Sequence, residues 1–275
     1  MTHGRFFTVQ DTDVFYHYCT PQAFLLICSN KTIRFSDVYT MNDSMEMQWG
    51  YKLWEDFAGS STGDNSKWDA LKSVVSDFIE VMVPLASCQS TQGDILSQWR
   101  AYSDDGTGFC IGFGSDFYRA LPASAMRVEY GLEEQRSEIR KLANIALALD
   151  ENSKEFTNAG MDLAVNLLGY KNPAFMEESE VRLVHAVARM PESAIIKSLG
   201  GRVGGASIDP VEIKFQMRQS TPSPYVDLSF SSAARPIAEI VLGPKNYAEA
   251  SRISEFLSTV GFPNVVVRKS TASYR

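Results

Sequence analysis

Two groups of carboxylates have the residue types that acid–base or metal-assisted chemistry needs. The first group surrounds Glu180, with Glu177 and Glu178 before it and Arg182 after it. Residues 179–187 alternate as a strand does, which predicts that Glu180 and Arg182 share a face. Surface strands commonly carry such ion pairs without any catalytic function. The group therefore has two interpretations: a salt-bridged surface strand, or a catalytic carboxylate beside a cation.

The second group consists of Asp209, Glu212 and Lys214. A strand that carries Glu-x-Lys can hold a divalent metal ion beside a lysine, as in many nucleases. A pattern this short also arises by chance, and an acidic protein is poorly suited to a nucleic-acid backbone. A metal-dependent nuclease that uses these three residues stays open as an alternative function.

His17 is a further residue that could do chemistry. It lies in the β-prone segment 14–19, V-F-Y-H-Y-C, between Tyr16 and Tyr18, and Ser36 lies in the next predicted strand. A single histidine in an aromatic strand is either a hydrogen-bonded core residue or a ligand contact.

The stretch 98–113 places two large aromatic rings beside a glycine-rich backbone. Trp99 and Tyr102 are three residues apart, so on a helix they share a face. The residues D-D-G at 104–106 predict a turn, and the apolar run 108–113 predicts a buried strand. This stretch is either a corner of the core or the wall of a ligand pocket.

Composition and motifs exclude several classes of protein. The chain has 275 residues, of which 44% are hydrophobic and 21% charged, and its net charge of −7 disfavours non-specific nucleic-acid binding. Dinucleotide and phosphate-loop glycine motifs and the G-x-S-x-G elbow are absent, and the three histidines form no H-x-x-x-H pair. We therefore expect no metal cofactor.

Residues 1–10 lack the apolar core of a signal peptide, and no apolar run approaches the roughly 18 residues of a membrane helix, so we expect a cytoplasmic protein without a membrane partner. The four cysteines are expected to be reduced core residues: Cys19, Cys28, Cys88 and Cys110.

Hydrophobic patterning predicts about ten short strands and six helices. Strands are expected at 14–19, 32–38, 83–89, 108–113, 126–130, 179–187, 211–217, 225–230, 237–242 and 265–269. Helices are expected at 22–29, 45–57, 68–81, 133–149, 155–168 and 247–260, and the glycines at 200–205 mark a flexible loop. Strands and helices do not alternate regularly, and no linker interrupts the chain. The sequence therefore predicts a single α+β domain over residues 1–275, built on mixed or antiparallel sheets with flanking helices.

Several motifs together resemble a bacterial family known as domain of unknown function 2971. They are H-Y-C-T at 17–20, L-L-I-C-S-N-K-T-I-R-F-S at 25–36, M-N-D-S-M-E at 41–46, S-Q-W-R-A-Y-S-D-D-G-T-G-F-C-I-G-F at 97–113, E-E-S-E-V-R-L-V at 177–184 and the closing S-T-A-S-Y-R. The resemblance spans nearly the whole chain, but it supplies no activity.

A more distant resemblance is to ADP-ribosyltransferases, in the order and strand placement of a few residues. It implies that His17 holds the nicotinamide ribose of NAD, that Ser36 lines the pocket, and that a late glutamate, Glu180, is catalytic. It further nominates an aromatic wall for stacking and a basic partner for the pyrophosphate. The aromatic candidates are Tyr18, Trp99 and Tyr102, and the basic candidates are Arg34 and Arg182.

The chemistry that this resemblance implies needs no metal. Breaking the bond between nicotinamide and ribose develops positive charge on the ribose, and a nearby carboxylate such as Glu180 stabilises that charge. His17 could donate to a ribose hydroxyl without being charged. The first hypothesis is therefore an ADP-ribosyltransferase or NAD glycohydrolase, with a protein or nucleic acid as an unidentified acceptor and a role as a toxin or effector in bacterial defence against phage. A non-catalytic ligand-binding or sensor module of such a defence system is the alternative beside the nuclease.

Overall fold

The architecture is known from a computed structural model that describes residues 4–40, 44–60, 66–190, 192–193, 195–198, 201–203 and 206–274, with side chains undescribed at 44–47 and 201–208. The strands are β1 (Phe6–Phe7), β2 (Phe15–Cys19), β3 (Thr32–Asp37), β4 (Met82–Ser90), β5 (Phe109–Phe113), β6 (Ser124–Arg127), β7 (Glu180–Met190), β8 (Ile195–Lys197), β9 (Gly201–Val203), β10 (Ala206–Ile208), β11 (Lys214–Arg218), β12 (Thr221–Ser229), β13 (Ile237–Leu242) and β14 (Val266–Lys269). The α-helices are α1 (Pro21–Asn30), α2 (Ser44–Ser60), α3 (Ser66–Val81), α4 (Leu96–Tyr102), α5 (Ser115–Ala120), α6 (Leu132–Leu147), α7 (Lys154–Asn166) and α8 (Ala250–Thr259). Short 3-10 helices lie at η1 (Val38–Thr40), η2 (Leu167–Gly169) and η3 (Pro173–Glu178).

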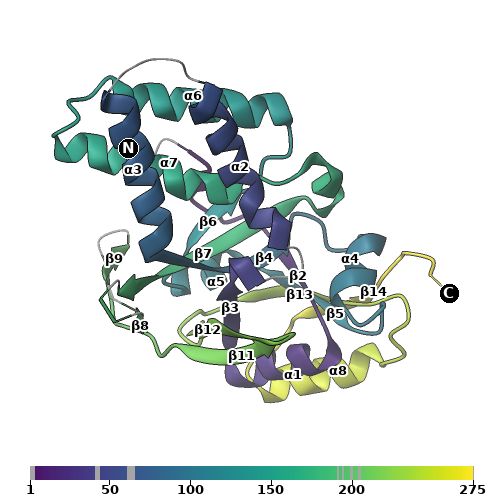
Figure 1. Cartoon of the computed structure of the whole chain (residues 1–275). Coiled ribbons are helices and arrows are strands. Elements are labelled where there is room, and N and C mark those ends of the chain that lie inside the picture. Colours follow the sequence, from purple (N-terminus) through teal and green to yellow (C-terminus); the bar gives the residue numbers. More distant parts are fainter. Residues whose placement is uncertain are drawn as a thin grey trace.

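The predicted fold class is confirmed: the chain is a mixed α+β structure with a mostly antiparallel sheet flanked by helices. Among the described residues, twelve strands form one sheet, and only β13 and β14 pair in parallel within it. Strands from both ends of the chain, β1 and β14, belong to this sheet, as a single domain requires. Figure 1 shows α2, α3, α6 and α7 gathered on one side of the sheet and α1 with α8 on the opposite side.

The sheet forks at β4. One edge of β4 pairs along its whole length with β7, from Met82 opposite Ala188 to Ser90 opposite Glu180. The other edge meets two different strands, because β2 pairs with it only at Ser90 and β3 pairs only at residues 85–86. β2 continues into a branch with β5, β13 and β14, whereas β3 continues into a branch with β12 and β11. The helix α1 follows β2 and precedes β3 in the chain, so it connects the two branches of the fork.

Local sequence explains how α1 is placed between the branches. Thr20 is its N-cap, and the Thr20 hydroxyl accepts a hydrogen bond from the backbone N–H of Ala23 over 3.2 Å. Pro21 follows at the first helical turn, where its missing N–H costs nothing. Lys31 ends the helix in the left-handed conformation with φ of 52°, and β3 begins at the next residue. These signals fix α1 as a ten-residue crossover between β2 and β3.

The predicted elements are found, with differences where tertiary pairing overrides composition. The T-P-S-P residues at 221–224 look like part of a turn, yet β12 begins at Thr221 and pairs there with β11 alone. In the described chain no strand pairs with the other side of 221–224, and proline is tolerated at such a free edge. The predicted flexible loop at 200–205 includes β9, which pairs with β10, while residues 200, 204 and 205 lie outside the described residues. No prediction covered β1, β8, β10 or the six-residue helix α5.

Two large apolar cores and two smaller clusters support the sheet among the described residues. The larger core joins the sheet to α1, α5 and α8, and its aromatic centre includes Phe113, Phe117 and Phe230. The second core is made by α2, α3, α6 and α7, around residues such as Trp54 and Phe156. Strands of both branches contribute to the larger core, for example through Ile111 and Phe35, so this core holds the strands that form the fork.

Candidate functional site

The fork holds a cavity of about 750 Å³. Its walls come from β2, α1 and β3 on one side of β4 and from β7, η3 and α4 on the other. Sites for small molecules and cofactors are typically 300–1,000 Å³ and sit where elements of a sheet diverge. This cavity is therefore the candidate functional site.

The cavity brings together six of the eight residues that the sequence nominated for the site. These six are His17, Tyr18, Arg34, Ser36, Tyr102 and Glu180. The other two, Trp99 and Arg182, are almost fully buried and do not line it. Trp99 and Arg182 instead support two residues that do line the cavity, because Trp99 packs on Tyr18 and Arg182 pairs with Glu180.

His17 projects from β2 toward the edge of β4. Its Nδ1 lies 3.1 Å from the carbonyl oxygen of Cys88. A carbonyl oxygen only accepts, so Nδ1 carries the hydrogen of this contact. Burial lowers the pKa of His17, although the hydrogen bond to Cys88 acts in the opposite direction. In the neutral ring Nε2 is then an acceptor, so a ligand hydroxyl would donate to His17 rather than receive a hydrogen bond from it.

Glu180 is a buried carboxylate held by two cations. Arg182 Nε donates to Glu180 Oε1 over 2.8 Å, and Lys171 Nζ lies 3.1 Å from Oε2. Burial alone would raise the pKa of Glu180, but the charges of Arg182 and Lys171 and their hydrogen bonds lower it to about 2. The carboxylate is therefore ionised at neutral pH, and part of its charge is neutralised by its partners.

Cys88 connects His17 to Glu180. The carbonyl oxygen of Cys88 faces the His17 ring, and its thiol lies near enough to the Glu180 carboxylate for each group to affect the pKa of the other. Burial raises the pKa of the Cys88 thiol well above its usual value, so the thiol keeps its proton at neutral pH. The two predicted catalytic residues thus line the cavity from the two strands that flank β4, which are β2 and β7. All four cysteines are free, as predicted.

Lys171 and Glu178 belong to the site although the sequence analysis did not identify them as site residues. Lys171 Nζ pairs with Glu178 Oε2 as well as with Glu180, and its side chain is only 2% exposed. Glu178 Oε1 accepts a hydrogen bond from the Tyr102 hydroxyl over 3.1 Å. Two carboxylates therefore share one lysine at the cavity wall, and the E-S-E spacing at 178–180 is the only sequence signal that could have indicated it.

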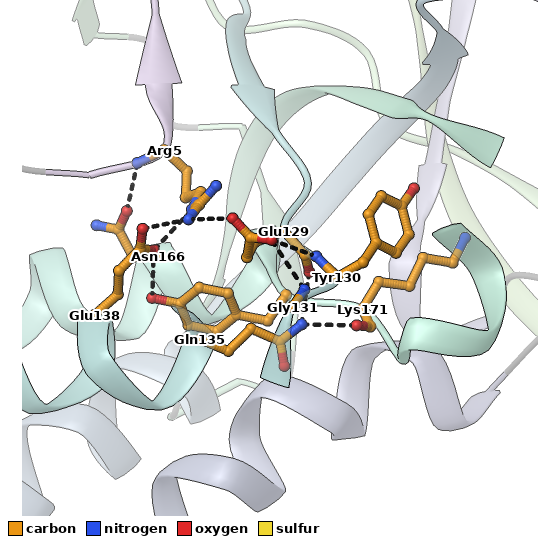
Figure 2. Close-up of polar contacts among 9 residues, drawn as sticks. Arg5, Glu129, Tyr130, Gly131, Gln135, Glu138, Asn166 and Lys171 are labelled. Carbon is orange, nitrogen blue, oxygen red and sulfur yellow. Dashed lines mark hydrogen bonds and ion pairs between the residues drawn. The ribbon is translucent and has the colours of Figure 1, made fainter. Parts of the chain in front are cut away.

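The main chain of Lys171 is fixed by a network behind the cavity, which Figure 2 shows. The buried side chain of Gln135 donates from Nε2 to the carbonyl oxygens of Lys171, over 2.7 Å, and Glu129, over 2.6 Å. The Lys171 N–H in turn donates to the Glu129 carbonyl oxygen over 3.1 Å. Arg5 pairs with the carboxylates of Glu129 and Glu138. The start of the chain and helix α6 thereby position the lysine that holds Glu178 and Glu180.

Trp99 supports the wall from behind. It is completely buried, its ring packs edge-on against Tyr18 with centroids 4.9 Å apart, and its Nε1 donates to Asp94 Oδ1 over 2.8 Å. The Tyr18 hydroxyl accepts from the Ile95 N–H over 2.8 Å. Of the two aromatic residues on α4, Tyr102 therefore faces the cavity. Trp99 is buried at a corner of the core, which was one of the two interpretations of this stretch.

Basic side chains enter the cavity from β3 and β11. Arg34 donates to Asp227 Oδ1 over 3.0 Å, and its guanidinium lies over the Tyr225 ring at 3.8 Å from the centroid. Arg218 is exposed, lines the cavity and makes no ion pair with any residue in the described part of the chain. The sequence did not single out Arg218, because nothing near it marks a site.

None of the three residues of the nuclease alternative lines this cavity. Lys214 Nζ is 3.7 Å from Glu212 and 3.4 Å from Asp227, and Asp209 is an exposed residue in the segment before β11. Within the ranges that the structure describes, no three His, Cys, Asp or Glu side chains are grouped as a metal site would require.

Comparisons with known proteins support one part of the family resemblance. Residues 98–183 match the model of a family described as Protein of unknown function (DUF2971). This match includes all of α4 after its first two residues, the turn that follows and the start of β7, so the resemblance is supported over that segment. No curated protein and no solved structure matches the chain. Over the described residues, no helix combines the length and apolar character needed to cross a membrane.

Proposed function

We propose that the cavity binds NAD and cleaves the bond between nicotinamide and ribose, in an ADP-ribosyltransferase or NAD glycohydrolase reaction. The observation that carries this proposal is that His17 and Glu180 line one cavity, together with Cys88 of β4, whose carbonyl oxygen accepts from the His17 ring. The cavity volume of about 750 Å³ is in the range of cofactor sites.

The proposed chemistry assigns a role to each polar group on the wall. Cleavage breaks the C1′–N bond and releases neutral nicotinamide, while positive charge develops on the ribose. The ionised carboxylate of Glu180 stabilises that charge, and His17 Nε2 accepts a hydrogen bond from a ribose hydroxyl. The nucleophile, a water molecule or an acceptor group, attacks C1′ and gives up a proton. Glu178, on the same wall, is the acceptor proposed for that proton.

The phosphates of NAD require cations in the same cavity. Arg182 is committed to Glu180 and to the carbonyl oxygen of Leu168, so it does not serve this purpose. Arg34 and Arg218 line the cavity on the opposite side of β4 from Glu180, and guanidinium groups bind phosphate in a bidentate manner. We assign the pyrophosphate to these two arginines.

A non-catalytic binding module is the second candidate, and a specific observation favours it. The two cations on Glu180 neutralise much of its charge, as in a purely structural ion pair. Such a module would bind NAD in the same cavity without releasing nicotinamide. A role as a toxin or effector in defence against phage stays a prediction from sequence for either candidate.

Nicotinamide release from NAD by the purified chain tests the proposal. Wild type is compared with Glu180→Gln and with Glu177→Gln, which changes an exposed glutamate that does not line the cavity. We expect release by wild type and by Glu177→Gln, and loss of at least about a hundredfold in Glu180→Gln, in line with removal of one charge-stabilising group. Stimulation by added cell lysate would indicate transfer to a macromolecule.

Thermal unfolding of each variant shows whether it is folded. NAD binding without release by folded wild type would favour the binding module. Failure of folded wild type to bind or cleave NAD, with and without lysate, would overturn the assignment of this cavity to NAD.

A further inference from the structure

The segment 270–274, which follows β14, lies across α4 and is attached at both ends of that helix. At the start of α4, the carboxylate of Asp94 accepts hydrogen bonds from Ser270 Oγ, from the Thr271 N–H over 2.7 Å and from Thr271 Oγ1 over 2.8 Å. Figure 1 shows this final segment running past α4.

At the end of α4, the second attachment involves the turn at 104–106. The Tyr274 hydroxyl donates to Asp105, and Lys245 Nζ lies 2.8 Å from the same carboxylate and 3.8 Å from the centre of the Tyr274 ring. Asp105 lies in the turn after α4 with a φ of 53°, and its side chain is 59% exposed. The segment therefore spans α4 from Asp94 to Asp105.

Asp94 also holds α4 directly. Its Oδ1 accepts from Trp99 Nε1 over 2.8 Å, and Ala272 of the crossing segment packs against the cluster around Trp99. Asp94 thus joins the crossing segment to the buried face of the helix. Gln98, Ala101 and Tyr102 of the same helix line the cavity, where Tyr102 donates to Glu178.

We propose that Asp94 is a positioning residue: it holds the segment 270–274 across α4 and thereby fixes Tyr102 beside Glu178 in the cavity. A seven-residue helix has little stability of its own, so its place depends on such attachments. Only the kinetic part of the test rests on the proposed function, since the position of α4 is measured without a ligand.

Hydrogen–deuterium exchange of the α4 amides tests the proposal in the full chain. Asp94→Asn weakens the charge-assisted hydrogen bonds from Trp99 and Thr271, and we expect exchange within residues 96–102 to become about tenfold faster. Exchange in β4 and β7 should not change. The control is Asp116→Asn, because Asp116 likewise joins a short helix, α5, to a distant backbone N–H, that of Arg235, far from α4 in sequence.

A second variant separates a positioning role from a general loss of stability. Thr271→Val removes one partner of Asp94. In the double variant, the increase in α4 exchange should therefore be smaller than the sum of the increases in Asp94→Asn and Thr271→Val. Unchanged α4 exchange in Asp94→Asn, or an equal increase in β4 and β7, would overturn the proposal. Additive effects of the two variants would also overturn it.

The kinetic part uses Tyr102→Phe. If Asp94 acts through Tyr102, Tyr102→Phe raises the KM for NAD in wild type and has little further effect in Asp94→Asn. If Asp94→Asn speeds exchange in α4 alone but leaves the KM for NAD unchanged, Asp94 does not act on the cavity through Tyr102. A chain that does not cleave NAD still gives the exchange result, so failure of the proposed function is distinguished from failure of this proposal.

Discussion

Glu180 and Arg182 lie on the same face of β7, and Arg182 Nε donates to Glu180 Oε1 over 2.8 Å. Both side chains are almost completely buried, with 4% and 2% of their surface exposed. The Arg182 guanidinium also donates to the Leu168 carbonyl oxygen over 2.6 Å. The pair is therefore a buried one whose remaining polar atoms are satisfied, and removal of one member leaves the other charge unpaired.

The first prediction concerns the stability of this pair. Glu180→Ala should lower the free energy of unfolding by about 3–5 kcal/mol, because Arg182 and Lys171 would then be buried without their carboxylate. Glu180→Gln should cost less, since the amide oxygen still accepts from Arg182. Urea unfolding measures both, and Glu177→Gln should stay within about 0.5 kcal/mol of wild type. Equal stability of Glu180→Ala and wild type would contradict the ion pair.

The second prediction is a loss of stability in acid. The folded-state pKa of Glu180, about 2, is below its ordinary value of 4.5, so the folded state favours the ionised form. The resulting stabilisation is fully present above pH 4.5 and is lost as the pH falls from 4.5 toward 2, with a total of about 3 kcal/mol. Unfolding free energies of wild type and Glu180→Gln between pH 2 and 7 isolate this contribution, because other carboxylates titrate in both proteins. Parallel curves for the two proteins would show that Glu180 contributes none of it.

The sequence predicted best those site residues whose positions follow from local periodicity. Strand alternation placed Glu180 and Arg182 on one face of β7, and it placed Arg34 and Ser36 on the face of β3 that lines the cavity. These relationships need only the period of two along a strand.

The remainder of the site depends on contacts between distant segments. Lys171 reaches Glu180 only because Gln135 fixes its backbone, and neither residue stands out in the sequence. Trp99 and Tyr102 look equivalent on a helix, and the packing of Trp99 on Tyr18 decides which of them faces the cavity. The fork itself cannot be read from any one strand, because it depends on where β2 and β3 leave β4.

The third prediction is that His17 stays neutral across the physiological range. Burial lowers its pKa from the usual value, so the folded ring takes up a proton only at a lower pH than a free histidine does. A histidine NMR titration should show Nδ1 protonated and Nε2 unprotonated at pH 7. Nicotinamide release should be independent of His17 ionisation between pH 7 and 9. An imidazolium form at pH 7 would contradict both the tautomer and its role as an acceptor.

The fourth prediction separates the two aromatic residues of α4. Trp99→Ala should destabilise the fold by about 3–5 kcal/mol, because it empties a fully buried site and leaves Asp94 without one of its donors. Tyr102→Phe should cost about 0.5–1.5 kcal/mol, because it removes only the hydrogen bond to Glu178. Urea unfolding measures the difference. Similar costs for Trp99→Ala and Tyr102→Phe would place both residues in the same environment, contrary to the structure.

The fifth prediction concerns Arg218 and the phosphates of the ligand. Its guanidinium lines the cavity without an ion pair in the described residues, so it is available to an anion. Arg218→Gln should raise the KM for NAD by about tenfold, the loss expected when a charged hydrogen-bond partner of phosphate is removed. Nicotinamide riboside lacks the pyrophosphate, so its cleavage should be equally efficient in Arg218→Gln and wild type. Arg252→Gln on α8 is the matched control, since Arg252 is exposed and lies outside the cavity. An equal rise in KM for both substrates would mean that Arg218 shapes the cavity instead of binding phosphate, and no rise for either would remove it from the site.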